Sequence, residues 1–124
     1  MLINVLEYLE NTAKKLPDKP AFVDEKGEYT YSELELKAKN IGSTIASYSY
    51  RNRPVIIYLD KGIKVIASFM GILYSGNFYS PIDTGMPLER AKTIISVATP
   101  PIIITDLQRP VVIFNSLKNK FCCV

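Results

Sequence analysis

The sequence of 124 residues contains no histidine, and its two cysteines stand side by side as Cys122 and Cys123. Without histidine, Ser-His-Asp and Cys-His catalysis and every imidazole metal site are excluded. Two thiols are too few for a disulfide framework or a four-ligand zinc site, and adjacent cysteines rarely bridge each other. We therefore interpret the pair as incidental, assign it no role, and expect the protein to work in the reducing cytoplasm.

Long apolar runs and clustered charge are also lacking. The most apolar stretch, 65–74, is far shorter than the ~20 residues that a membrane-spanning helix needs. The first residues do not have the pattern of a signal peptide. Fifteen basic and twelve acidic residues give a formal net charge of +3, and they are spread along the chain without a basic arm. We expect a soluble protein that binds neither a membrane nor nucleic acid.

The chain does have the composition of one globular domain, with 48% hydrophobic and 22% charged residues. Its first segment, 4–16, carries apolar residues at helical spacing behind a potential N-cap, Asn4. Two short strands, 21–23 and 28–31, then flank a turn that contains Gly27. We therefore expect a helix followed by a short β-hairpin.

The next helix has the strongest signals in the sequence. Thr30 and Glu33 have the spacing of a capping box, although Ser32 and Glu35 fit the same rule two residues later. The exact first residue therefore stays open, whereas the helix itself does not. Apolar residues at intervals of four and three form one stripe along it: Leu34, Ala38, Ile41, Ile45 and Tyr48.

The second half of the chain alternates apolar runs with helical patterns. The runs 54–59, 78–82 and 102–104 indicate buried strands, and the segments 63–75 and 87–98 between them indicate helices. This order is that of two consecutive βαβ units. The predicted fold class is therefore α/β: a partial doubly wound parallel sheet, preceded by the helix and the short hairpin.

These elements fill residues 1–106, which we predict to be one domain. Beyond this point the patterning weakens. The apolar stretch 110–114 can add one more strand, whereas 115–124 has the composition of a loose polar tail. We therefore describe 107–124 as an extra strand followed by a loose C-terminal tail.

Two sets of residues invite a chemical interpretation and are better explained by structure. Gly71 and Gly76 have the spacing that opens a P-loop, but the lysine and hydroxyl that complete the motif are missing. The pair also lies at a helix C-terminus, where carbonyl groups repel phosphate, so helix packing and a C-cap are favoured. Three tyrosines within apolar segments are expected to pack there and not to stack on a ligand: Tyr58, Tyr74 and Tyr79.

Asp60, Asp83 and Asp106 each follow an apolar strand, which is where open parallel sheets place their sites. Three carboxylates there can hold Mg²⁺ through water. Aspartate after a strand is also an ordinary helix cap or turn former, and no phosphate loop or lysine completes a nucleotide site. We favour the cap or turn interpretation, and we assign no catalytic, cofactor-binding or metal residue.

Four stretches nevertheless match known motifs. Residues 29–34 read Tyr-Thr-Tyr-Ser-Glu-Leu, 19–23 read Lys-Pro-Ala-Phe-Val, 71–83 end in Pro-Ile-Asp, and 87–90 read Pro-Leu-Glu-Arg. They resemble the adenylate-forming (AMP-binding) acid ligase family, in particular amino-acid adenylation domains of peptide synthetases and D-alanine–carrier-protein ligases. Tyr, Ser and Phe stand where that family usually has Lys, Ala and Ala around its glycine, at positions that concern packing. The likeness covers roughly 1–106.

The resemblance implies an N-terminal fragment of a larger enzyme. Intact members are several times longer, and they carry their phosphate loop, ribose aspartate, metal ligand and mobile lysine downstream of the matched stretches. They convert ATP and a carboxylic acid into an acyl-adenylate and pyrophosphate, and then transfer the acyl group to a thiol. ATP and Mg²⁺ are thus expected for the intact family, and none is expected to be bound by this chain alone. The matched motifs are scaffold, so no catalytic residue is transferred.

Two hypotheses about function follow. In the first, the chain is the truncated N-terminal scaffold of an ATP-dependent, AMP-forming, amino-acid-activating ligase, inactive alone, whose partner is a complementing downstream polypeptide or a carrier protein. In the second, it is a small non-catalytic α/β binding or docking module. The residues do not identify the acid substrate or the oligomeric state.

Overall fold

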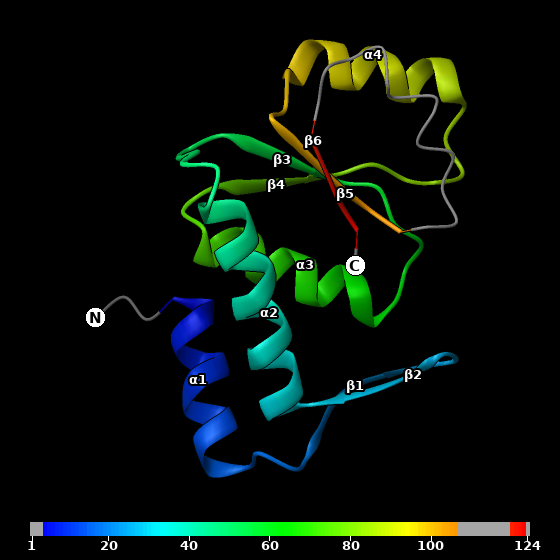
Figure 1. Cartoon of the computed structure of the whole chain (residues 1–124). Helices are drawn as coiled ribbons and strands as arrows, with labels where there is room; N and C mark the ends of the chain where they lie inside the picture. The colour runs from blue at the N-terminus through cyan, green and yellow to red at the C-terminus, as the bar shows by residue number, and fades with distance from the viewer. Residues whose placement is uncertain (1–3, 107–119, 124) are drawn as a thin grey trace.

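The computed structural model describes residues 4–106 and 120–123 (Figure 1). Its first half contains α1 (Val5–Lys15), β1 (Pro20–Asp24), β2 (Gly27–Thr30) and α2 (Tyr31–Ala46). The rest contains β3 (Pro54–Ile57), α3 (Ile63–Tyr74), β4 (Phe78–Pro81), α4 (Leu88–Ala98), β5 (Ile102–Thr105) and β6 (Lys120–Cys123). Within these described segments, no helix combines the length and the apolar character that crossing a membrane would require.

One parallel sheet, with strand order β4-β3-β5-β6, organises the second half. Val55 in β3 lies opposite Tyr79 of β4 on one side and opposite Ile102 of β5 on the other. The chain therefore leaves β3 through α3 to reach β4, and returns through α4 past β3 to reach β5. This is the doubly wound arrangement of two βαβ units, and it confirms the predicted fold class.

Helices cover both faces of this sheet, which explains why its central strands are apolar throughout. Successive residues of β3 point to opposite faces. Ile57 packs with Ile45 of α2 and Ile72 of α3, whereas Ile56 packs with Ile95 of α4. Figure 1 shows α4 on one side of the sheet, with α2 and α3 on the other.

A third apolar cluster lies where α1, α2 and α3 meet, and it contains Leu9, Leu34, Ala38, Ala67 and Met70. Glycines let α2 and α3 approach closely. A Cβ atom on Gly71 would lie 2.7 Å from the Cβ of Ile41 and 3.0 Å from the carbonyl oxygen of Ala38. One on Gly42 would lie 2.8 Å from the Cβ of Tyr74. The predicted packing role of Gly71 is confirmed.

A capping box sets the start of α2. Thr30 Oγ1 accepts a hydrogen bond from the Glu33 amide at 3.2 Å, and the Glu33 carboxylate accepts one from the Thr30 amide at 3.3 Å. Of the two alternatives in the sequence, the one that begins at Thr30 is therefore confirmed, and Ser32 lies inside the helix. Tyr31, expected at the end of the hairpin, is instead the first helical residue, and Tyr48 lies beyond the helix C-terminus.

Two expectations for element ends are corrected. Pro87 is the N-cap of α4 and does not lie within its first turn. Residues 120–123, expected in a loose tail, form β6 and pair in parallel with β5. Pairing with a distant strand leaves little local signal in the sequence, because strand formation depends strongly on its neighbours. The strand expected at 110–114 and the remaining tail residues lie outside the described residues, so the division at residue 106 stays a prediction.

Candidate functional site

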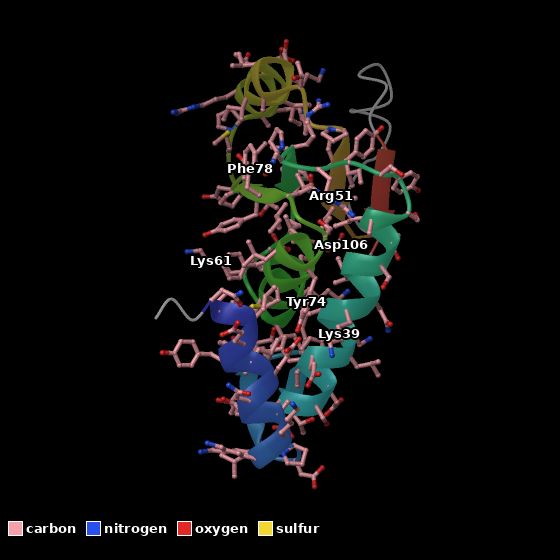
Figure 2. The ribbon with its side chains drawn as sticks, turned by 90° about the vertical axis from the view of Figure 1, so that its left-hand side faces the viewer. Lys39, Arg51, Lys61, Tyr74, Phe78 and Asp106 are labelled. Atoms are coloured by element: carbon pink, nitrogen blue, oxygen red, sulfur yellow. The ribbon has the colours of Figure 1, made fainter. Side chains whose placement is uncertain are left out.

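A cleft of about 560 Å³ opens at the carboxyl ends of β3 and β5. Three segments line it: residues 59, 60 and 106 after the two strands, residues 61–64 at the start of α3, and hairpin residues 24 and 26–29. Two of the lining residues, Lys61 and Asp106, are labelled in Figure 2. The position agrees with the rule that open parallel sheets place sites beyond the carboxyl ends of their strands.

The three aspartates singled out from the sequence have three different roles. Asp60 and Asp106 both line the cleft, and Asp106 is buried. Asp60 Oδ1 accepts a hydrogen bond from Thr84 Oγ1 at 2.6 Å, which ties the loop after β3 to the loop after β4. Asp83 accepts from the Gly85 amide at 2.9 Å within its own turn and does not line the cleft. The turn interpretation is thus confirmed for Asp83, whereas Asp60 and Asp106 are brought together by the fold.

Sequence reasoning missed the carboxylate that caps α3, which is Asp24 in the hairpin. Asp24 Oδ2 accepts from the Ile63 amide at 2.9 Å, while Oδ1 accepts from the amides of Lys26 at 2.8 Å and Gly27 at 3.0 Å. The N-cap position itself is Gly62, which has no side chain to offer. Capping rules consider residues next to the helix, and Asp24 comes 39 residues before Ile63. The only local hint is a glycine at the N-cap.

These hydrogen bonds keep the Asp24 carboxylate ionised. The bond from the Ile63 amide, followed by that from Lys26, holds the pKa of Asp24 below its ordinary value of 3.8, because amide donors favour the charged form. A carboxyl whose pKa is depressed in the folded state stabilises that state above its ordinary pKa. Its contribution is lost only as pH falls through the lowered value. The cap of α3 is therefore intact at neutral pH.

The described part of the cleft does not fit a nucleoside triphosphate. Its lining carries four carboxylates against three lysines, so it offers no excess of positive charge to a phosphate chain. The Ile63 amide lies in the first turn of α3, where a phosphate would bind, and it already donates to Asp24. Among residues 4–106 and 120–123, no three or more cysteine, aspartate or glutamate side chains gather as metal ligands. No catalytic step can be placed on these residues.

The opposite, amino end of the sheet is held together by side chains of the loop before β3. Arg51 Nη1 donates to the carbonyl of Ser75, the C-cap of α3, at 2.9 Å. Arg53 Nη2 donates to the carbonyl of Thr99, the C-cap of α4, at 3.1 Å. Buried Asn77 accepts from the Arg53 amide at 3.0 Å. Both arginines thus place positive charge at the negative ends of helices that lie on opposite faces of the sheet.

The end of α3 also confirms the C-cap interpretation of the glycine pair. Gly76 directly follows the C-cap Ser75 and has a φ of +81°, a left-handed conformation that favours glycine. The side chain of Arg51 crosses over it, because a Cβ atom on Gly76 would lie 3.1 Å from Arg51 Cδ. Neither Gly71 nor Gly76 lines the cleft. Their roles are packing and chain reversal.

The tyrosines confirm the packing interpretation to different degrees. Tyr58 is buried in the cluster beneath α4. Tyr79 lies edge-to-face with Phe69 of α3 at a centroid distance of 4.3 Å, but it remains 43% exposed on β4. β4 is at the edge of the sheet as far as the described residues extend, so its side chains are less covered than those of β3.

Tyr74 joins the three helices of the N-terminal cluster. Its hydroxyl donates to Glu10 of α1 at 2.8 Å, and Lys39 of α2 lies 4.0 Å from the same carboxylate. Lys39 also pairs with Glu35 at 2.7 Å within α2. Burial, together with the bond to Glu10, raises the pKa of Tyr74. Figure 2 shows Tyr74 and Lys39 close together where these helices meet.

Comparison with known sequences reveals clear relatives. The family described as AMP-binding enzyme matches residues 9–121. The chain is 29% identical over 113 residues to the D-alanine–D-alanyl carrier protein ligase of Lacticaseibacillus casei, covering 91% of this chain and 22% of the ligase. It is 30% identical over 129 residues to the ligase of the same name from Bacillus cereus, covering 96% and 25%. A linear gramicidin synthase of Brevibacillus parabrevis is 29% identical over 103 residues, covering 82% of this chain and 1% of the synthase.

Solved structures with similar folds agree. A crystal structure of the nonribosomal peptide synthetase FmoA3 superposes with a TM-score of 0.81 at 30% identity, over 86% of this chain and 12% of the synthetase. VinN in complex with 3-methylaspartate superposes with a TM-score of 0.86 at 20% identity, over 96% of this chain and 34% of VinN, which shows the fold alone. This chain spans about a fifth to a quarter of the length of the carrier protein ligases that it matches.

Proposed function

Because this chain belongs to the AMP-binding enzyme family, we propose that it is the N-terminal scaffold of an AMP-forming ligase that activates an amino acid with ATP. The observation that carries the proposal is the extent of the match. Residues 9–121 fit the family, and yet the chain covers only 22% of one carrier protein ligase and 25% of another. We propose further that the chain is inactive by itself.

The cleft supports the second part of this proposal. Activating a carboxylic acid with ATP requires cationic groups that offset the phosphate charge and a donor that positions the attacking carboxylate. The described cleft balances its lysines with carboxylates, and its helix N-terminus is already occupied by Asp24. In the proposal, the groups that bind ATP and Mg²⁺ come from a complementing polypeptide.

The substrate class and the acceptor are proposed from the relatives. Two of them are named for D-alanine and a D-alanyl carrier protein, and a third is a gramicidin synthase. An amino acid as substrate and a carrier protein as acceptor are therefore the proposed partners of the complete ligase.

The test is an ATP–pyrophosphate exchange assay on the purified chain with a panel of amino acids that includes D-alanine. The L. casei ligase serves as positive control, and a reaction without protein sets the background. We expect no exchange above background, because the described cleft has no excess of positive charge for a triphosphate. Robust exchange by this chain alone would contradict the proposed inactivity.

A complementation assay tests the scaffold role itself. The chain is mixed with an L. casei ligase from which the matching 113 residues have been removed. Exchange that appears only in the mixture supports the scaffold role. A chain that melts cooperatively by itself and restores no exchange would favour the alternative, a non-catalytic α/β binding module.

A further inference from the structure

The hairpin β1–β2 forms a separate two-stranded sheet. Figure 1 shows it extending from the first turn of α2, apart from the main sheet. Its base is anchored, because Ala21 and Tyr29 pack against the cluster formed by α1, α2 and α3. Towards its tip the hairpin buries little apolar surface: Phe22 is 40% exposed and Val23 is 68% exposed. Its tip must therefore be positioned by polar contacts.

The contact that joins this tip to the body of the protein is the Asp24 carboxylate, bound to the Ile63 amide at 2.9 Å. The other partner is shaped to receive it. A Cβ atom on Gly62 would lie 2.6 Å from Asp24 Oδ2, so any side chain at position 62 would push the carboxylate away. A glycine at the start of α3 and a carboxylate in the hairpin are thus matched to one contact.

The same hairpin forms one wall of the cleft. Residues 26–29 share the cleft lining with Asp60 and Asp106, and Asp24 lies where this wall meets α3. Any movement of the hairpin tip relative to α3 therefore changes the width of the cleft and the access to both carboxylates.

We propose that the β1–β2 hairpin is a strap over this cleft, with its hinge at the base of β1 and Asp24 as its latch. The pairing of β1 with β2 shifts register between Pro20 and Phe22, and such irregularities bend and loosen a strand. Segments with few buried apolar contacts open locally at low free-energy cost. When Asp24 leaves α3, the strap swings about its base and the cleft opens. The strap is a property of this chain alone and does not rest on the proposed ligase function.

Amide hydrogen exchange on the intact chain tests the latch. Asp24→Ala removes it, and we expect the amides of Ile63 and of the hairpin to exchange about tenfold faster, since charge-assisted hydrogen bonds of this kind govern local opening. The amides of β3 and β5 should keep their rates, and they report whether the variant is folded. Asp24→Asn retains one acceptor oxygen and should give an intermediate rate.

Asp83→Ala is the matched control, because Asp83 also accepts a backbone hydrogen bond in a turn but lies outside the cleft lining. It should leave the hairpin rates unchanged. Two results would overturn the strap: hairpin amides that exchange no faster in Asp24→Ala, or acceleration that is equal in the hairpin and in β3 and β5, which would mark a loss of global stability.

A double-mutant cycle tests whether Gly62 and Asp24 act through the same contact. Gly62→Ala in the natural background should open the hairpin about as much as Asp24→Ala, because the added methyl group would lie against Oδ2. In the Asp24→Ala background, Gly62→Ala should add at most about a twofold change, since the clashing oxygen has gone. Hairpin exchange rates that multiply independently in the double variant would overturn the proposal.

Discussion

The two ends of the parallel sheet are built differently. At the amino end, Arg51, Arg53 and Asn77 bind the backbone of neighbouring segments and hold the C-termini of α3 and α4 in place. At the carboxyl end there is a cleft, and the start of α3 is held by Asp24 from a hairpin outside the sheet. One end is closed by its own loops, whereas the other is bridged by a distant element.

Helix polarity explains the difference in charge. In a parallel α/β arrangement, helix C-termini lie at the amino ends of the strands and attract cations, and helix N-termini lie at the carboxyl ends and attract anions. Arg51 and Arg53 meet the first requirement, and Asp24 meets the second. The carboxyl end is therefore the adaptable one, because a side chain can leave a helix N-terminus and a ligand can replace it.

The largest effect is expected from a change that disturbs the platform shared by both ends. Gly71→Ala forces a Cβ atom against Ile41 and the carbonyl of Ala38, so α2 and α3 must separate. We expect a loss of about 3 kcal/mol in the free energy of unfolding, at the upper end of the range for overpacking. Thermal and urea unfolding measure it. Gly85→Ala is the control, because the added Cβ would meet only ordinary contacts there, and equal losses in both variants would contradict the packing argument.

The next effect separates the two ends. Asn77→Ala removes the acceptor of the Arg53 amide and the donor to the carbonyl of Tyr50, both in a buried or partly buried setting. Leaving such groups unpaired should cost about 2 kcal/mol of unfolding free energy. Urea unfolding provides the value, and hydrogen exchange of the hairpin should not change. Asn77→Asp, which keeps the acceptor and loses the donor, should lie between; a loss as small as that of an exposed polar residue would refute the closed amino end.

A smaller effect is expected at the arginine that caps α4. Arg53 is exposed, and its bond to the Thr99 carbonyl competes with water. Arg53→Ala should therefore reduce the unfolding free energy by about 0.5 kcal/mol, and the reduction should shrink in high salt. Arg90→Ala, an exposed arginine near the N-terminus of the same helix, serves as the control. A salt-independent effect of Arg53→Ala would argue against helix-end electrostatics.

The smallest effect concerns pH and the carboxyl end alone. Because the pKa of Asp24 is held below 3.8 in the folded protein, its cap persists as pH is lowered and is lost only when pH falls through the depressed value. Hairpin amides should therefore show increased opening, corrected for the intrinsic exchange rate, below this point and not between pH 7 and 5. In Asp24→Asn this pH dependence should disappear. Opening that changes between pH 7 and 5 would point to a different group.

Several local features were predictable because their causes lie within a few residues of each other. The capping box of Thr30 and Glu33 set the start of α2, and the continuous apolar run of β3 indicated a strand covered on both faces. Gly71 and Gly76 were correctly assigned to packing and a C-cap. Asp60 and Asp106 were also placed at the correct end of the sheet, although their shared cleft was not foreseen.

The features that were missed depend on contacts between distant residues. Asp24 meets Ile63 across 39 residues, and the Tyr74 hydroxyl meets Glu10 across 64. The strand at 120–123 exists through its pairing with β5, and the hairpin became a wall of the cleft through its place beside α3. Neither periodicity nor capping rules report such pairs, because those signals extend over only one or two helical turns or the length of a strand.

The amino-acid order alone thus determined the alternation of strands and helices, their caps and their apolar faces, since these arise from local backbone preferences and the periodic burial of side chains. The tertiary structure decided which strand lies between which, that Asp60 and Asp106 share a cleft, and that a hairpin carboxylate caps α3. These outcomes follow from closing long loops around a common core, where the burial of the whole chain and not the neighbouring residues selects the partners.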